Sequence, residues 1–391
     1  MYRIGQEEID AVARVINNGM LFRVNTDLQE CDQFERELAQ KIGTKYALYL
    51  SSGTGALIAA LAGIGIGPGD EVIVPGYTFM ASAMAVVAVG AIPVIAEIDD
   101  TMTLDINDVK RKISKHTKAI IPVHICGFPC NMEALCKLAD EYDLFIIEDA
   151  CQADGGSYKG KRLGTFGKAG CFSFNYFKVI SVGEGGAVVT DDEKVYERAL
   201  IYHDSGAAFR PYSKGLTEPV FLGAQLRVSE ITGAIMREQL KRLDGILNDL
   251  RAVKKEIIAG ISGSGLTVMP SNDTEGDCGT TLGLQFKSEK AARAFNACEG
   301  FEGMLPIDSG KLVYTNWTPI LEKRGAHNED VNPYNHPKNQ GLNMNVSKDT
   351  CPYTLDILSR TVFISLHPDW DKEKINAAIK AICDAAKTVG E

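Results

Sequence analysis

The stretch from about residue 45 to residue 190 alternates short β-rich runs with amphipathic segments of helical period, and no other feature constrains the fold as strongly. This alternation is typical of a mostly parallel sheet covered by helices on both faces. Strands are expected at Tyr46–Leu50, Glu71–Pro75, Ile92–Glu97, Ala119–Val123, Leu144–Glu148, Cys171–Phe174 and Ala187–Thr190. Helices are expected at Thr54–Ile64, Met80–Val89, Ile106–Ile113 and Asn131–Tyr142. The sequence therefore predicts an α/β fold with a large, mostly parallel seven-stranded sheet.

The chain after Asp192 predicts a change of architecture. A long helical run from about Ser229 to Ile261 is expected to carry the chain away from the large sheet. We expect a large domain over residues 1–245, with an N-terminal helical segment, and a small α+β domain over residues 246–391. The elements expected in the small domain are strands at Leu266–Met269, Thr280–Phe286 and Thr361–Leu366 and helices at Glu289–Cys298 and Asp371–Lys387.

Within the small domain, the stretch Asn316–Cys351 is rich in Asn, Pro and Gly. Its polar and irregular composition is poorly suited to a core. We interpret it as a loop insertion, placed over a site, to which Trp317, His327 and His336 would belong.

Charge and composition narrow the class of protein. With 391 residues, of which 45% are hydrophobic, the chain is long enough for two domains. Its formal charge of -10 and its lack of a Lys- and Arg-rich tract argue against nucleic acid or an acidic membrane surface as a partner. The sequence has neither an apolar leader nor an apolar run long enough for a membrane span, so we predict a cytoplasmic protein.

The ten cysteines stand at irregular positions and are interpreted as reduced core thiols. Potential metal ligands cluster at His124, Cys126, Cys130 and Cys136, but this cluster contains no Cys-x-x-Cys pair. A strand end followed by a loop and a helix explains the cluster better, and no metal is expected.

Lys178 lies in an apolar run, Cys171-Phe-Ser-Phe-Asn-Tyr-Phe-Lys-Val-Ile180, five residues before the turn Gly183-Glu-Gly-Gly186. Its aromatic and aliphatic neighbours predict a partly desolvated setting. Burial disfavours the ammonium form of lysine, so Lys178 is a candidate nucleophile near neutral pH, able to trap a carbonyl cofactor.

Other candidate residues follow the ends of predicted strands. The segment Ser51-Ser-Gly-Thr-Gly55 opens a helix, where backbone amides and hydroxyls can surround a phosphate. Ser173 offers a hydroxyl to the same phosphate. Asp149 stands at the carboxyl edge of the sheet, where it would either cap a helix or keep a pyridine nitrogen protonated. Phe79 follows another strand and would either pack in the core or stack on a flat ring.

The order of these motifs resembles the DegT/StrS-type sugar and cyclitol aminotransferases, a branch of the fold-type I pyridoxal-phosphate enzymes. The matching motifs are Ser-Gly-Thr at 52–54, Thr-Phe at 78–79, Glu-Asp-Ala-x-Gln at 148–152, Ser-Phe at 173–174, Lys178 and Gly-Glu-Gly-Gly at 183–186. The resemblance covers about residues 5–245 strongly and the remainder loosely.

The resemblance implies a pyridoxal-phosphate cofactor bound as a Schiff base to Lys178, with Asp149 on the pyridine nitrogen and Phe79 stacked on the ring. It also implies Gln152 beside the phenolic oxygen, and Gly53, Thr54, Gly55 and Ser173 on the phosphate. A homodimer with shared sites is implied, in which an Asn of a Gly-x-Asn-x-Arg motif reaches the partner's phosphate. Here Gln225 stands in place of that Asn, in Gly223-Ala-Gln-Leu-Arg227.

The implied reaction is amino transfer in two halves, with pyridoxamine phosphate as the intermediate. Glutamate or glutamine would donate the amine to a keto-sugar or keto-cyclitol, as in amino-sugar biosynthesis. The segment His124–Cys130 resembles enzymes acting on scyllo-inosose, aminohydroxybenzoate precursors or 8-amino-octulosonate, and a nucleotide-linked keto-deoxysugar is the close alternative. Candidate substrate contacts are Arg23, Tyr77, His203, Arg227 and His327, of which Arg23 suits a carboxylate.

Two other functions were weighed. A sugar dehydratase of the same family would have His in place of the lysine, and Lys178 speaks against it. A non-catalytic pyridoxal-phosphate sensor would need a DNA-binding module, and neither the N-terminal sequence nor the acidic charge balance supplies one.

Overall fold

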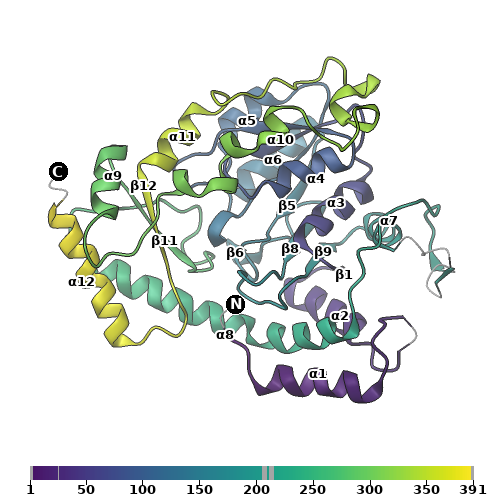
Figure 1. Cartoon of the computed structure of the whole chain (residues 1–391), viewed down its shortest axis with the longest axis horizontal. Helices are drawn as coiled ribbons and strands as arrows, with labels where there is room; N and C mark the ends of the chain where they lie inside the picture. The colour runs from purple at the N-terminus through teal and green to yellow at the C-terminus, as the bar shows by residue number, and fades with distance from the viewer. Residues whose placement is uncertain (1–2, 25, 205–208, 211–214, 389–391) are drawn as a thin grey trace.

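A computed structural model of the chain describes residues 3–24, 26–204, 209–210 and 215–388, and Figure 1 shows its large sheet flanked by helices. The sheet has seven strands in the order β1-β9-β8-β5-β4-β2-β3. Strand β9 is antiparallel to both of its neighbours, and the other pairings are parallel. The strands are β1 (Tyr46–Leu50), β2 (Glu71–Pro75), β3 (Ile92–Ala96), β4 (Thr117–Ile120), β5 (Phe145–Asp149), β8 (Ala169–Ser173) and β9 (Gly186–Thr190). The predicted α/β fold and its sheet are confirmed.

Alternate residues of the strands enter two different cores, as the period of a β-strand requires. In β1, Ala47 and Tyr49 face one core, whereas Leu48 and Leu50 face the other. Helices α2 (Glu30–Ile42), α5 (Ile106–Lys112), α6 (Met132–Tyr142) and α8 (Glu230–Gly260) cover the first face, and α3 (Gly53–Ile64), α4 (Ala81–Ala88) and α7 (Glu193–His203) cover the second. The sheet is therefore buried on both sides, which explains its nearly continuous apolar strands.

Helix α3 illustrates how local sequence sets the helix ends near the sheet edge. Ser52 is the N-cap, and its hydroxyl accepts a hydrogen bond from the amide of Gly55 at 3.0 Å. Gly65 ends the helix with φ of 96°, a left-handed conformation that glycine adopts without strain. The helix is thus fixed in register with its first turn at the end of β1.

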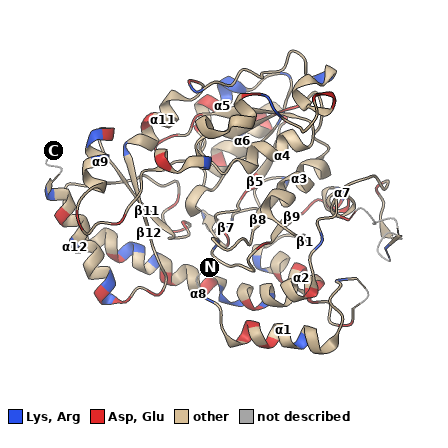
Figure 2. Ribbon diagram, in the orientation of Figure 1, with Lys and Arg blue, Asp and Glu red and all other residues tan. Residues whose placement is uncertain are grey.

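The N-terminal helix α1 (Gln6–Asn18) packs against α8 and α2 through charged side chains as well as apolar ones, and Figure 2 shows these charges along the three helices. Arg237 of α8 pairs with Glu30 at 2.8 Å and with Glu37 at 2.7 Å. Arg242 pairs with Glu7 at 2.7 Å and with Glu8 at 2.8 Å. This network fixes the N-terminal segment on the first half of α8.

Helix α8 then extends from the large sheet toward the C-terminal elements (Figure 1). Its second half packs against α12 (Lys372–Thr388), and the apolar core of the first face continues along it. The C-terminal sheet is antiparallel, with β10 (Thr267–Val268), β11 (Thr281–Gln285) and β12 (Thr361–Ser365), and α9 (Glu289–Asn296) packs on β12. The predicted small α+β unit is present, and the division at residue 245 stays a prediction.

The stretch 316–351 differs from the predicted surface loop. It begins with α10 (Thr318–Leu321), continues through short 3-10 turns and leads to α11 (Pro352–Ser359). Trp317 is fully buried in the core of the second sheet face, and Tyr334 is buried with it. Asn339 binds Gly69 and Gly90 of the large domain by side-chain hydrogen bonds of 2.6 and 2.9 Å. The interpretation as a polar loop outside the core was therefore wrong.

A two-stranded hairpin of β6 (Ser157–Tyr158) and β7 (Lys161–Arg162) completes the described elements of the large domain. Among the helices that the structure describes, none has the length and apolar character needed to cross a membrane.

Candidate active site

The predicted cofactor residues meet at one edge of the large sheet. Strands β1, β2, β5 and β8 run in the same direction, so their carboxyl ends share an edge. Asp149 ends β5, Ser173 ends β8, Phe79 follows β2, and Ser52 follows β1. In open α/β sheets this edge is where ligands bind.

Lys178 lies in the loop between β8 and β9, whose backbone is held by short hydrogen bonds. Its amide donates to the carbonyl of Asn175 at 2.9 Å, and the amide of Phe174 donates to Gly185 at 2.8 Å. The side chain is half-buried, and its ammonium forms no hydrogen bond or ion pair within the described residues. The lysine is thus held by its backbone with a free amino group.

The setting of Lys178 differs in one respect from the prediction. Tyr176 and Phe177 are 54% and 83% exposed, so these aromatic rings do not shield the amine. Val179 and Ile180, which are buried, form the apolar side of the loop. Of the neighbours that predicted partial desolvation, Val179 and Ile180 are buried, whereas the two aromatic residues directly before the lysine are not.

Asp149 is buried and oriented from both sides. One of its carboxylate oxygens accepts a hydrogen bond from the hydroxyl of Ser82 at 2.7 Å, and the other accepts from the amide of Cys151 at 3.2 Å. The hydroxyl of Thr78 lies 2.9 Å from that of Ser82 and extends the chain of hydrogen bonds. Such bonds hold both carboxyl oxygens of Asp149 in a fixed orientation.

The preceding residue, Glu148, anchors the same strand end. Its carboxylate accepts hydrogen bonds from the amides of Gly164, Phe166 and Gly167 at 2.6 to 2.9 Å, and it lies 3.2 Å from His124 Nε2. Both side chains are fully buried. His124 thus belongs to the support of β5. Among the described residues, no group of three His, Cys, Asp or Glu side chains is arranged to hold a metal ion.

The phosphate-cradle candidate is formed by the first turn of α3. The first amides of a helix have no partner within it, and they carry the positive end of the helix dipole. Gly53 lies against Ser173 and Cys151: a Cβ at position 53 would stand 2.8 Å from Ser173 Cβ and 2.9 Å from Cys151 Sγ. Only glycine allows the helix turn to approach the end of β8 this closely.

This close approach predicts unequal effects of alanine at two neighbouring glycines. Gly53→Ala should weaken pyridoxal-phosphate binding by roughly tenfold, because overpacking costs about 1–3 kcal/mol and pushes the cradle away from Ser173. Gly55→Ala is the matched control: its Cβ would meet Ser52 Oγ at 3.2 Å and Leu226 methyl groups at 3.5 Å or more, so binding should stay within about twofold. Fluorescence titration of the apoprotein measures both, and equal affinities would contradict the assignment of the cradle.

Gln152 and Phe79 complete the group. Gln152 Oε1 accepts the amide of Cys126 at 3.0 Å, which leaves the NH₂ group of the side chain as a donor. Phe79 is 38% exposed, with Lys311 Nζ 4.9 Å from its ring centre. An exposed ring and a donor amide near the sheet edge suit a flat, polar ligand.

The arrangement fits pyridoxal phosphate in each part: a helix N-terminus with a required glycine for the phosphate, a fixed carboxylate for the ring nitrogen, and an unpaired lysine amine. When bound, this cofactor supplies a carbonyl that captures amines and a ring that withdraws electrons. The protein's residues would then bind and orient it, and Asp149 would hold a proton at the ring nitrogen.

The Gly223–Arg227 segment lies next to the cradle. The amide of Ser51 donates to the carbonyl of Leu226 at 2.9 Å, and Ala224 and Leu226 donate to Tyr202 and His203 at 2.8 Å. The side chain of Gln225 is exposed. Its assignment to a partner's phosphate stays a prediction.

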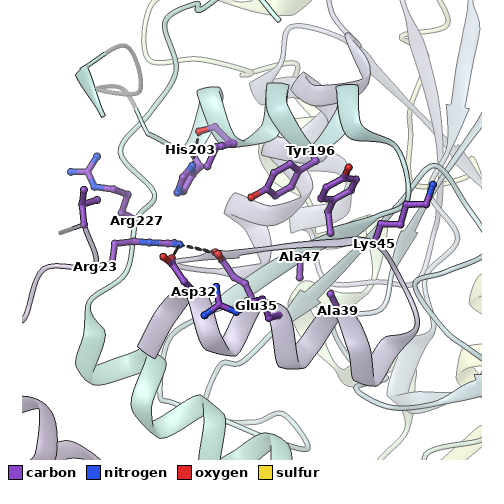
Figure 3. Close-up of a pocket in the computed structure, with 13 residues that line it drawn as sticks. Arg23, Asp32, Glu35, Ala39, Lys45, Ala47, Tyr196, His203 and Arg227 are labelled. Carbon is purple, nitrogen blue, oxygen red and sulfur yellow. Dashed lines mark hydrogen bonds and ion pairs between the residues drawn. The ribbon is translucent and has the colours of Figure 1, made fainter. Parts of the chain in front are cut away.

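Three candidate substrate residues, Arg23, His203 and Arg227, line a separate cavity of about 460 Å³ (Figure 3). None of the predicted cofactor contacts lines it. Arg23 binds Asp32 at 2.9 Å and Glu35 at 3.0 Å, and Arg227 pairs with the buried Asp204. Burial, followed by the charge of Arg23, lowers the pKa of His203 to about 4. The structure brings the three residues together, but not beside Lys178.

The contacts of Arg23 predict a role in stability. Glu35 is 9% exposed, so Arg23→Ala would leave its carboxylate buried without its cation, at a cost of about 3–5 kcal/mol in the free energy of unfolding. Burial already raises the pKa of Glu35, so the folded state favours the protonated acid and loses stability as the pH rises. The deficit of the variant should therefore grow from pH 5 to pH 8 in urea unfolding.

The double variant Arg23→Ala with Glu35→Gln is the control, because it removes the unpaired charge and should recover part of the loss. A single variant with unchanged stability and a raised KM for donor or acceptor would instead support the substrate contact inferred from the sequence.

The remaining substrate candidates lie elsewhere. Tyr77 is fully buried, and its hydroxyl makes no hydrogen bond within the described residues. His327 is exposed, on the segment that packs beside the end of α4 and the start of β3. That is the opposite edge of the sheet from Lys178, so the structure does not bring His327 to the site.

The sequence interpretation missed Ser82 and Asp154, and it gave Thr78 no role beyond its place in the Thr-Phe motif. Ser82 is three residues after Phe79 and would have looked like an ordinary helix residue. Its bond to Asp149 joins positions 67 residues apart, which only the fold brings together.

Comparisons with known proteins agree with this geometry. The profile of the DegT/DnrJ/EryC1/StrS aminotransferase family matches residues 2–290. Spore coat polysaccharide biosynthesis protein SpsC of Bacillus subtilis (strain 168) is 31% identical over 98% of this chain and 95% of its own. GDP-perosamine synthase of Escherichia coli O157:H7 is 40% identical, over 56% of this chain and only 60% of its own length.

Among solved structures, an aminotransferase from Psychrobacter cryohalolentis superimposes with a TM-score of 0.82 at 27% identity, over 100% of this chain and 99% of that one. The family profile and the full-length likeness to SpsC agree with the motifs at the sheet edge. The chain therefore belongs to the DegT/DnrJ/EryC1/StrS aminotransferase family, and it is an enzyme of the pyridoxal-phosphate-dependent transferase class.

Proposed function

We propose that this enzyme moves an amino group from glutamate or glutamine to the ketone of a sugar or cyclitol. The observation that carries the proposal is the placement of Lys178, Asp149 and the Ser52–Gly55 turn at one sheet edge. The unpaired amino group of Lys178 suits a residue that is first displaced by the donor's amine and then takes a proton from the donor's Cα. Asp149 keeps the electron-withdrawing ring protonated during that step.

The first candidate acceptor is a nucleotide-linked keto-deoxysugar. The likeness to GDP-perosamine synthase supports it, because the name of that relative describes a nucleotide-linked amino sugar. The second candidate is a cyclitol or octulosonate ketone, favoured by the sequence of His124–Cys130. This segment contacts the site, since the amide of Cys126 binds Gln152.

The test combines donor and acceptor in two steps. Glutamate, glutamine and alanine are added separately to the loaded enzyme, and the visible spectrum and the released keto acid are recorded. The aminated form is then mixed with a nucleotide 4-keto-6-deoxyhexose, scyllo-inosose or a keto-octulosonate, and product mass is measured. Replacement of the carbonyl oxygen by NH₂ supports amino transfer, and loss of a hydroxyl without amination supports dehydration. If no donor converts the cofactor to its aminated form, the protein lacks the proposed activity, and this result supports the hypothesis of a non-catalytic sensor.

The proposal includes a homodimer with shared active sites. Gln225 extends from a segment whose backbone is fixed, and Leu222, three residues before it, is 91% exposed. Exposed apolar side chains beside a polar one suit a subunit interface. Light scattering after gel filtration tests the dimer, and a monomer with full activity would contradict it.

A further inference from the structure

Asp154 is a buried acid that the proposed reaction does not use. It lies in the turn after β5, two residues beyond Gln152, and is 2% exposed. Neither of its carboxylate oxygens has a hydrogen-bond partner that meets normal geometry within the described residues. Burying a carboxylate without partners is costly, so a side chain kept in this state needs an explanation.

The surroundings of Asp154 point to the Lys178 loop. The ammonium of Lys178 and the backbone amides of Val179 and Ile180 act on its carboxyl and favour the charged form. Burial acts more strongly in the other direction and raises the pKa of Asp154 well above its ordinary value. The buried Asp154 carboxyl therefore lies within electrostatic range of the Lys178 ammonium, next to the backbone of Val179 and Ile180.

Other titratable groups near this pair do not alter its charge balance. Burial raises the pKa of the Cys126 thiol to about 11, and it raises those of Cys151 and Cys278 as well, so these thiols are neutral. Lys254 is paired with Asp277 at 2.6 Å. Among the residues that the structure describes, Lys178 is thus the cation that acts on Asp154.

The geometry points to Asp154 as a positioning residue for Lys178, holding one proton jointly with it and setting the pH at which the lysine becomes a free amine. The pair has no net charge when Lys178 is an ammonium and Asp154 a carboxylate. It also has no net charge when Lys178 is an amine and Asp154 a carboxylic acid. Interconversion needs only the movement of one proton, and no net charge is buried. The inference rests on the proposed function only in taking Lys178 as the reacting amine.

Asp154→Asn tests the inference, because it keeps the size of the side chain and removes its charge. In the apoprotein, Lys178 is labelled with acetic anhydride across a pH series and quantified by peptide mass spectrometry. Without the nearby carboxylate, the midpoint of labelling should fall by about one pH unit, which means about ten times more free amine at a given pH. Asp192→Asn is the control, since Asp192 pairs with Lys168 and not with Lys178.

A reciprocal measurement covers the case in which Asp154→Asn does not fold. Carbon-13 NMR follows the titration of the Asp154 carboxyl in wild type and in Lys178→Ala, where loss of the cation should raise its midpoint. Unchanged midpoints in this experiment, or in the labelling experiment, would overturn the inference. Neither uses a donor or an acceptor. A protein that shows the shifts but transfers no amine would contradict the proposed function alone.

Discussion

Lys178→Ala should lower turnover by on the order of 10⁴-fold or more, because in the proposed reaction this lysine is both the covalent attachment of the cofactor and the base of the proton transfer. The fold should be retained, since the side chain is half-buried and its amine forms no hydrogen bond in the described part of the chain. Steady-state rates with the best donor and acceptor, together with circular dichroism, measure the two effects separately.

Lys168→Ala provides the matched control. This lysine lies ten residues earlier, is 40% exposed and pairs with Asp192, so its loss should leave turnover within about twofold. Amino transfer that persists in Lys178→Ala at more than a trace would exclude this residue as the cofactor anchor.

Asp149→Asn should lower turnover by about 10²–10⁴-fold, because the neutral amide cannot hold a proton at the ring nitrogen with the strength of a carboxylate. Asparagine preserves the size of the side chain and can still bond to Ser82 and to the amide of Cys151. Cofactor affinity should therefore change less than the rate, and the two are measured by titration and by single-turnover kinetics with glutamate.

Ser82→Ala tests the orientation of the Asp149 carboxylate separately from its charge. It removes the 2.7 Å hydrogen bond but leaves the carboxylate, so its rate should fall by only about tenfold. If Asp149→Asn were as active as wild type while Ser82→Ala was impaired, the proposed role of Asp149 at the ring nitrogen would be contradicted.

The large sheet was predictable because each strand is a short apolar run that ends at a turn, whereas the segments between the strands have a helical period. The stretch 316–351 was not, because its burial depends on a few large side chains within a polar sequence. Trp317 enters the sheet core, while Asn332 and Asn339 satisfy buried backbone groups with their amides. Composition alone could not reveal that these polar side chains form hydrogen bonds inside the protein.

The candidate site also contains some residues that the sequence could predict and others that it could not. Asp149, Ser173 and the Ser52–Gly55 turn stand at strand ends, so their meeting follows from sheet direction. Arg23 looked like a carboxylate ligand because an arginine fork suits one, yet the carboxylates it binds are Asp32 and Glu35 of its own chain. Ser82 and Asp154 act through partners distant in sequence, and a single chain carries no local sign of such pairs.

The antiparallel pairing of β8 with β9 has a consequence for how this enzyme can vary. Ser173 stands opposite Gly186, and a Cβ on Gly186 would strike the backbone of Ser52 at 2.3 Å. The loop that carries Lys178 thus starts and ends next to the Ser52–Gly55 turn, because Ser173 and Gly186, which flank the loop, both contact that turn. Residues of this loop can be substituted, but its length is constrained. Inserting or deleting one residue would shift Lys178 relative to the Ser52–Gly55 turn.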